Sequence, residues 1–327
     1  MKRFVWGSGR LIPNNGGESR PSHIFRSAAL SGIRATHTSV LGDARRQGNS
    51  VNVMKWLVRL AGIAAAVFVI YFVANLSSLY ARVKLDRSYP ALSRYAFERT
   101  PRIAIVGSSM SFRLYEGYFG TSLRNLSIGG GSASTGLAII ASYTSIPDLI
   151  LVETNILSRP IEPDLVAAFG SNTSEPYQWF RPARAVISWV YRWVKYKSEA
   201  ENVKRLPLLR PETYDIVQNV NATIAEYAGK NWDAIMRPHM RELAAQVQEL
   251  ERRGCKVLLF ELPAVPQLRD NEYVRVARKI AKEAFPDEVR WLEISDQELR
   301  WVDASHFDER SAILVARQID KYLAAER

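Results

Sequence analysis

The sequence has little of the chemistry that disulfide bonds and metal sites require. Among its 327 residues there is one cysteine, Cys255, and there are four histidines. A single cysteine excludes an intrachain disulfide and a cysteine-based zinc site of the usual ligand count. The histidine and carboxylate residues show no cluster with metal-ligand spacing. We therefore expect neither a metal nor another cofactor.

Acidic residues are scarce at the start of the chain. Residues 1–59 hold ten basic side chains and two acidic ones, whereas the rest of the chain holds 34 and 31. The net charge of +11 therefore belongs mainly to a leader and not to a basic folded domain, so we predict no nucleic-acid partner. Residues 1–53 are rich in Gly, Ser, Asn and Arg and show no sustained hydrophobic periodicity, which is typical of disorder.

Charged residues are absent from residues 60–81. These 22 residues would form a helix long enough to cross a hydrocarbon core of about 30 Å. Basic residues are in excess on the amino-terminal side, which predicts a cytoplasmic N-terminus. We expect a transmembrane anchor over residues 54–82 and a linker over 83–101. The protein would then be a single-pass inner (cytoplasmic) membrane protein with a periplasmic, extracytoplasmic domain.

Other interpretations of this segment stay open. A buried soluble helix would normally be shorter and carry a polar stripe, and a cleaved signal peptide usually has an apolar region of only about 7–15 residues. The residues Met54 to Arg59 resemble the short positive start of a membrane-targeted protein. Translation that begins at Met54 is therefore a hypothesis, which a native peptide from residues 1–53 would contradict.

Apolar, strand-like segments alternate with helical patterns over residues 102–327. Strands are predicted at Ile103 to Val106, Leu123 to Ile128, Asp148 to Glu153, Lys256 to Glu261 and Arg290 to Ile294, and helices at 133–143, 232–253, 273–284 and 310–325. This alternation favours an α/β fold: a doubly wound, flavodoxin-like, five-stranded parallel sheet with helices on both faces. A long, aromatic-rich stretch over about 158–230 is predicted to be a helical cap, whose aromatic residues either pack onto the sheet or meet a membrane surface or a sugar.

Four loops carry the residues with chemical potential. In an open α/β sheet, ligands bind at the carboxyl ends of the strands. Ser109 follows the first predicted strand, Gly130 the second and Asn155 the third, and Asp303 and His306 precede the last helix. Acyl transfer needs a nucleophile, a general base with its orienting carboxylate, and donors for an oxyanion. These loops could supply all of them.

The four motifs, in this order and spacing, resemble those of the SGNH hydrolase superfamily, the GDSL-type lipases and acylhydrolases. The resemblance covers residues 102–325 apart from the cap. The segment 105–109 matches the motif of the nucleophile, implying that role for Ser109. The segments 125–130 and 153–155 match the motifs of the oxyanion hole, implying that Gly130 and Asn155 join the Ser109 amide there. Asp303 and His306 match the Asp-x-x-His motif, implying an orienting residue and a general base.

Two departures from the family pattern point to a subgroup. Ser108 replaces the usual Asp before the nucleophile, and Glu153 and Ile156 replace the Gly and Asp around Asn155. Such variants resemble membrane-anchored proteins of cell-envelope and exopolysaccharide O-acylation. The resemblance implies a serine esterase or O-acyltransferase that acts on ester groups, above all O-acetyl groups of envelope or exported polysaccharide, beside polysaccharide-modification or export proteins. A non-catalytic polysaccharide-binding or export-complex accessory protein is the alternative.

Competing assignments exist for individual residues. Ser109 could be a turn residue or helix cap, and Asn155 could cap a loop. His239 is a second histidine within the predicted folded part, and Asp308 could replace Asp303 as the orienting residue. A nucleotide site at 129–132 is disfavoured because no Lys follows in the Gly-Lys-Ser/Thr arrangement.

Overall fold

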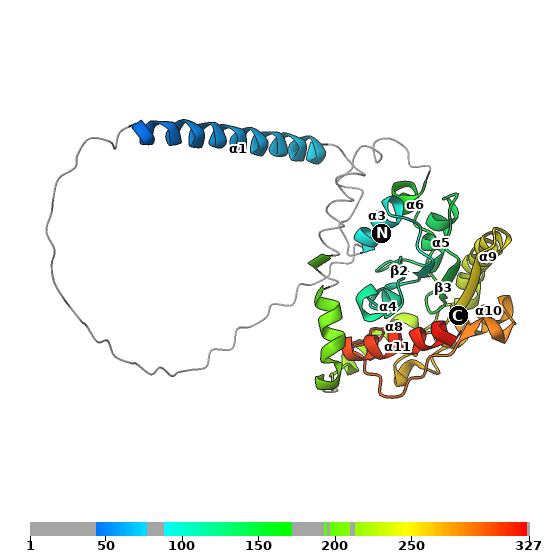
Figure 1. The fold of residues 1–327 in the computed structure, drawn as a ribbon. Helices are drawn as coiled ribbons and strands as arrows, with labels where there is room; N and C mark the ends of the chain where they lie inside the picture. Colours follow the sequence, from blue (N-terminus) through cyan, green and yellow to red (C-terminus); the bar gives the residue numbers. More distant parts are fainter. Residues whose placement is uncertain (1–43, 77–87, 172–192, 195–196, 210–212, 326–327) are drawn as a thin grey trace, which may run out of the picture. The chain divides into compact units, whose positions relative to one another are not determined.

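The computed structural model describes residues 44–76, 88–171, 193–194, 197–209 and 213–325 (Figure 1). Helix α1 (Ala44–Leu76) begins ten residues before the expected anchor, so residues 44–53 are helical and not part of an irregular leader. Arg45, Arg46 and Gln47 are good helix formers, but Gly48, Asn49, Ser50 and Asn52 are not, so these residues continue the helix of the apolar run and do not form it by propensity alone. Residues 1–43, where the rest of the predicted disordered leader lies, are outside the described residues.

Within the described residues, α1 is the one helix that is long and apolar enough to cross a membrane. The qualifying window is Val53–Ile70, and none of it is buried. It overlaps the predicted span 60–81, and the end of that span, residues 77–81, lies outside the described residues. The length and composition of α1 are consistent with a single membrane anchor.

The centre of the described C-terminal part is a parallel five-stranded sheet. Its strands are β1 (Ile103–Val106), β2 (Arg124–Asn125), β3 (Leu149–Glu153), β4 (Lys256–Phe260) and β5 (Trp291–Leu292), in the order β2-β1-β3-β4-β5. Every pair in the sheet is parallel. The predicted α/β class and parallel sheet are thus confirmed. The edge strands β2 and β5 are shorter than predicted because only two residues of each pair in register with the neighbouring strand.

Both faces of the sheet are apolar, as the continuous hydrophobic runs of its strands require. Alternate strand residues enter two separate clusters: Ala104 and Val106 belong to one, and Ile105 to the other. The first cluster includes residues of α5 (Ala133–Ala141), α9 (Trp232–Arg252) and α10 (Glu272–Ala284), and the second includes residues of α11 (Glu309–Ala325) (Figure 1). The carboxyl ends of the strands are therefore held between two packed layers.

Part of the predicted linker is a packed helix, α3 (Ser88–Phe97). Leu92 is fully buried, and the Arg94 guanidinium donates to Glu116 at 2.8 Å. Glu116 begins η1 (Glu116–Tyr118), and Arg124 of β2 also lies 3.4 Å from its carboxylate. Because these charges are mostly buried, their pairing offsets the cost of taking them out of water. The chain is thereby fixed to the sheet well before residue 102.

The predicted cap region, 158–230, is described in part. It contains α6 (Pro163–Phe169), helical residues 197–205, η2 (Leu206–Leu208) and α8 (Val217–Tyr227). The helical stretch contacts the body of the domain: the Gly117 N–H donates to Glu199 at 3.0 Å, and Asn202 donates to Glu309 at 2.6 Å. Most of its aromatic residues lie outside the described residues: Tyr177, Trp179, Phe180, Trp189, Tyr191 and Tyr196.

Candidate active site

Ser109 lies where the sequence analysis places it, just beyond the carboxyl end of β1. It begins the short helix α4 (Ser109–Phe112), which Ser108 caps by accepting a hydrogen bond from the Met110 N–H at 3.2 Å. Ser109 is half-buried, whereas Ser108 is 1% exposed. Among the described residues, the Ser109 N–H has no hydrogen-bond acceptor. Both the hydroxyl and the amide of Ser109 are thus candidates for contact with a substrate.

A tight loop before α11 positions His306. Trp301 and Phe307 form an antiparallel bridge, and the Val302 N–H donates to the His306 carbonyl at 2.9 Å. Inside this loop, Asp303 Oδ1 accepts the N–H groups of Ser305 and His306, both at 2.8 Å. Such a side-chain-to-backbone turn is typical of Asp and holds its carboxylate in one orientation. The three-residue spacing therefore folds Asp303 back onto the His306 ring.

Ser109, His306 and Asp303 form a continuous hydrogen-bonded series. His306 Nδ1 lies 2.8 Å from Asp303 Oδ2, and His306 Nε2 lies 3.0 Å from Ser109 Oγ. An ionised carboxylate can only accept, so in the neutral ring Nδ1 carries the proton and Nε2 accepts from Ser109. Residues 197 positions apart in the sequence are thus joined in the geometry that a nucleophile and general base require.

The electrostatic environment keeps Asp303 charged. Burial alone would raise the pKa of Asp303, but the hydrogen bond from the His306 side chain and those from the Ser305 and His306 backbones outweigh it. The pKa of Asp303 is therefore lowered from its usual value. A charged Asp303 stabilises the tautomer in which His306 Nε2 can take a proton and favours the imidazolium that results.

Gly130 and Asn155 lie on the loops after β2 and β3, the two neighbours of β1 in the sheet. Gly130 has a φ of +83°, a left-handed conformation that favours glycine, and among the described residues its N–H has no acceptor. The Asn155 side chain accepts from the Leu262 N–H at 2.8 Å and donates to the Leu262 carbonyl at 2.7 Å. This pairing fixes the amide and leaves one Nδ2 hydrogen for another acceptor.

The structure therefore joins three of the five candidate residues by hydrogen bonds. Among the described residues, no hydrogen bond links Gly130 or Asn155 to Ser109; the parallel topology places all three at the same edge of the sheet. Of the competing residues, His239 lies on α9 and Asp308 caps α11 by accepting from the Ser311 N–H at 2.7 Å. His306 is thus the histidine that contacts Ser109, and Asp303 is the carboxylate that contacts His306.

The sequence patterns do not identify the group that holds the turn around Ser109. Glu153, noted only as a departure from the family pattern, is 1% exposed and accepts hydrogen bonds from Ser108 and Ser111 on either side of the nucleophile. One signal could have identified this cluster: Glu153 is an acidic residue at the end of an apolar strand, and a buried acidic residue needs hydrogen-bond donors such as the serines on either side of Ser109.

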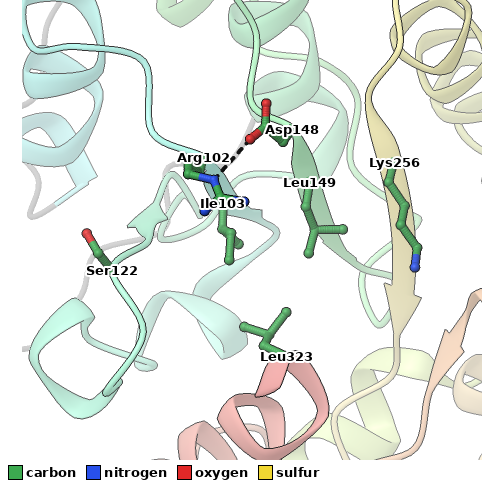
Figure 2. A pocket seen from close by; sticks show the side chains of 7 residues that line it. All are labelled: Arg102, Ile103, Ser122, Asp148, Leu149, Lys256 and Leu323. Carbon is green, nitrogen blue, oxygen red and sulfur yellow. Dashed lines mark hydrogen bonds and ion pairs between the residues drawn. The ribbon is translucent and has the colours of Figure 1, made fainter. Parts of the chain in front are cut away.

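A hollow of about 340 Å³ lies at the opposite end of the sheet (Figure 2). Ile103, Leu149 and Lys256, which line it, are the first residues of β1, β3 and β4. Figure 2 shows the ion pair of Arg102 with Asp148, 3.1 Å long and exposed, at its rim. Because ligands of open α/β sheets bind at the carboxyl ends of strands, this hollow is no part of the candidate active site.

No group of three or more His, Cys, Asp or Glu side chains is arranged to hold a metal ion in the part of the chain that the structure describes. Comparison with known protein families and with curated proteins finds no match for the chain.

Proposed function

We propose that this protein is a membrane-anchored serine esterase or O-acyltransferase organised like an SGNH hydrolase. The observation that carries the proposal is the series Ser109–His306–Asp303, with contacts of 3.0 and 2.8 Å. The sheet order β2-β1-β3-β4-β5 supports the doubly wound, flavodoxin-like assignment, in which this edge of the sheet is the ligand-binding edge.

The reaction begins when Ser109 Oγ attacks the carbonyl carbon of an ester. His306 Nε2 accepts the hydroxyl proton, and Asp303 stabilises the imidazolium that forms. The Ser109 and Gly130 N–H groups and the Asn155 side-chain amide are assigned to the oxyanion, a role for which all three retain a hydrogen. The C–O bond of the ester then breaks, the leaving alcohol takes the proton from His306, and an acyl-Ser109 remains.

The second half of the reaction releases the acyl group. Water attack on acyl-Ser109 gives a carboxylic acid and makes the protein an esterase, whereas attack by a sugar hydroxyl gives a new ester and makes it an O-acyltransferase. In both cases His306 removes the proton from the attacking oxygen and returns it to Ser109. The same residues serve both outcomes, and exclusion of water by residues 158–230, which we assign as a cap, would favour transfer.

The substrate assignment follows from the anchor and from the resemblance to SGNH proteins. We assign residues 54–82 as the anchor, which the length and composition of α1 support. The excess of basic residues before this segment is the basis for assigning the N-terminus to the cytoplasm and the C-terminal domain to the periplasm. A domain so tethered meets envelope and exported polysaccharide together with the proteins that modify or export it. O-acetyl groups of such polysaccharides are therefore the proposed substrates.

Hydrolysis of an activated acetyl ester by the full-length protein in detergent tests the proposal. We expect Ser109→Ala and His306→Ala each to lower kcat by at least 10³-fold, because the nucleophile and its base act as a unit. His239→Ala, a histidine substitution on α9 away from the series, should leave kcat within twofold. Full activity in folded Ser109→Ala or His306→Ala would refute the assignment and favour the accessory-protein alternative.

A further inference from the structure

A buried carboxylate lies against the turn that carries the proposed nucleophile. Glu153 is the last residue of β3 and is 1% exposed. Among the described residues, no Lys, Arg or His side chain forms an ion pair with it. An isolated carboxylate in such a place is unfavourable unless several hydrogen bonds satisfy it. The groups that bind Glu153 therefore show what its position requires.

Four donors meet the Glu153 carboxylate, and all four come from the two serines that flank the nucleophile. The Ser108 N–H and hydroxyl donate to Oε2 and Oε1, each at 2.8 Å. The Ser111 N–H and hydroxyl donate to Oε2 at 3.2 and 2.6 Å. Two backbone and two side-chain contacts thus attach the turn to β3 on both sides of Ser109.

The approach of Glu153 to this turn is close enough to exclude a side chain at residue 107. A Cβ built on Gly107 would lie 2.1 Å from Ser111 Oγ and 2.6 Å from Glu153 Oε2. Real Cβ atoms essentially never approach heavy atoms so closely. Gly107 therefore allows the backbone of the turn to lie against the carboxylate, and the turn has little freedom to move relative to β3.

Of the three serines in this turn, Ser109 is the one that does not bind Glu153. Its hydroxyl contacts His306 Nε2 at 3.0 Å, while its neighbours Ser108 and Ser111 are held by the carboxylate. The amides of Ser108 and Ser111 are likewise occupied, whereas the Ser109 N–H has no acceptor among the described residues. The N–H and hydroxyl groups of Ser108 and Ser111 thus hold the turn, whereas the N–H and hydroxyl of Ser109 stay available to a substrate.

We infer that Glu153 is a positioning residue that fixes the Ser109 hydroxyl and N–H for acyl transfer through its bonds to Ser108 and Ser111. This inference rests on the proposed function of Ser109. Glu153 does not contact the reacting atoms and exchanges no proton with them. It acts by keeping the Ser109–His306 contact and the Ser109 N–H in one arrangement, and small displacements of such groups cost large factors in rate.

Glu153→Gln tests this inference with little change of shape. The amide replaces one acceptor oxygen by an NH₂ group. At the Oε1 position this group forces the Ser108 hydroxyl to accept instead of donate, and at the Oε2 position it opposes the N–H groups of Ser108 and Ser111. We expect the second-order rate constant for labelling of Ser109 by a fluorophosphonate to fall about 10- to 100-fold. Labelling of the full-length protein in detergent is followed to completion to give both the rate constant and the final amplitude.

The two parameters separate positioning from a merely structural role. A lower rate constant with full final amplitude supports positioning, because every molecule is folded but reacts slowly. A wild-type rate constant, with any loss confined to amplitude, overturns it. The matched control is Glu261→Gln, which removes a carboxylate just past the end of the neighbouring strand β4, where it binds Arg278. This control should label at the wild-type rate.

Ser108→Ala provides a second test, and the wild-type protein itself shows whether the proposed function holds. Should Glu153→Gln fail to fold, Ser108→Ala removes one of the four donors and should lower the rate constant about threefold to tenfold; an unchanged rate constant overturns the inference. Failure of the proposed function has a different signature. In that case the wild-type protein labels no better than Ser109→Ala, and the positioning role falls with the function.

Discussion

Asp303→Asn isolates the electrostatic part of the proposed mechanism from its geometry. The substitution preserves the size of the side chain, and the remaining oxygen can still accept the N–H groups of Ser305 and His306 that hold the loop. What changes is the group that faces His306 Nδ1, at the position where Asp303 Oδ2 lies 2.8 Å away. An NH₂ group there is a donor and cannot accept from Nδ1–H.

The expected magnitude follows from the tautomer of His306. A donor opposite Nδ1 favours the ring form with its proton on Nε2, and that form cannot accept the proton of Ser109 across the 3.0 Å contact. Loss of the carboxylate also removes the charge that stabilises the imidazolium. Together these effects should lower kcat by roughly 10⁴-fold, equivalent to about 5 kcal/mol of transition-state stabilisation.

The assay is the hydrolysis of an activated acetyl ester, with Asp308→Asn as the matched control. Asp308 lies two residues beyond His306 but caps α11 through the Ser311 N–H, and Asn serves as a helix cap about as well as Asp. Asp308→Asn should therefore keep kcat within twofold. An Asp303→Asn protein that is folded and retains more than a tenth of the wild-type kcat would refute the reasoning, as would a large loss in Asp308→Asn.

Three other predictions concern stability and accessibility. Since the pKa of Asp303 is lowered in the folded state, its ionised form stabilises the protein above the unfolded pKa of about 3.9, and this contribution is lost as the pH falls through the folded pKa. The difference in unfolding free energy between wild type and Asp303→Asn, measured by urea titration, should therefore shrink between pH 6 and pH 3. A difference that stays constant with pH would contradict this. Gly107→Ala should destabilise the protein by about 1–3 kcal/mol and slow ester hydrolysis, because its Cβ would lie 2.1 Å from Ser111 Oγ, whereas Gly120→Ala meets nothing closer than 3.6 Å and should change neither by much. Burial, followed by the nearby Glu251 and Asp148, raises the pKa of the Cys255 thiol to about 12. Iodoacetamide at pH 8 should therefore modify Cys255 only after the protein unfolds, which mass spectrometry would detect. Rapid modification of the native protein would argue against the burial of Cys255.

The strands that the sequence predicts most accurately are those buried on both faces. The predicted segment Ile103 to Val106 is β1 without any change of bounds, and β3 and β4 differ from prediction by one residue at one end. A strand that is buried on both faces is a continuous run of apolar residues, which marks its bounds clearly in the sequence. The edge strands are harder to delimit. Each pairs with one neighbouring strand only, so the path of the adjacent loops determines where the strand begins and ends.

The helix α3 shows what local patterns do not reveal. Residues 88–97 lack a clear apolar stripe, and part of what fixes them is a set of buried ion pairs: Arg94 with Glu116, and Arg124 with Glu116 and Glu98. Two of these pairs, Arg94–Glu116 and Arg124–Glu98, join residues more than twenty positions apart, so their formation depends on the tertiary fold. Local patterns therefore do not predict this helix, which lies in the segment expected to be a linker.

The candidate site was predictable where spacing determines contact. Asp303 and His306 are three residues apart in a turn, and Ser109 follows a strand whose carboxyl end faces the same edge. The role of Glu153 was not predictable from spacing, because its contacts with Ser108 and Ser111 depend on the register of β3 beside β1. In that register Val106 lies beside Val152, which brings the next residue, Glu153, under the turn.

The central claim is that Ser109 is an activated nucleophile, and site mapping of a covalent probe tests it most directly. Full-length protein in detergent is treated with a fluorophosphonate, digested, and analysed by mass spectrometry. Our account predicts one adduct on Ser109, its loss in Ser109→Ala and His306→Ala, and its retention in Ser305→Ala, a serine of the His306 loop. Absence of an adduct on Ser109 in the folded wild-type protein, or equal labelling of His306→Ala, would contradict it.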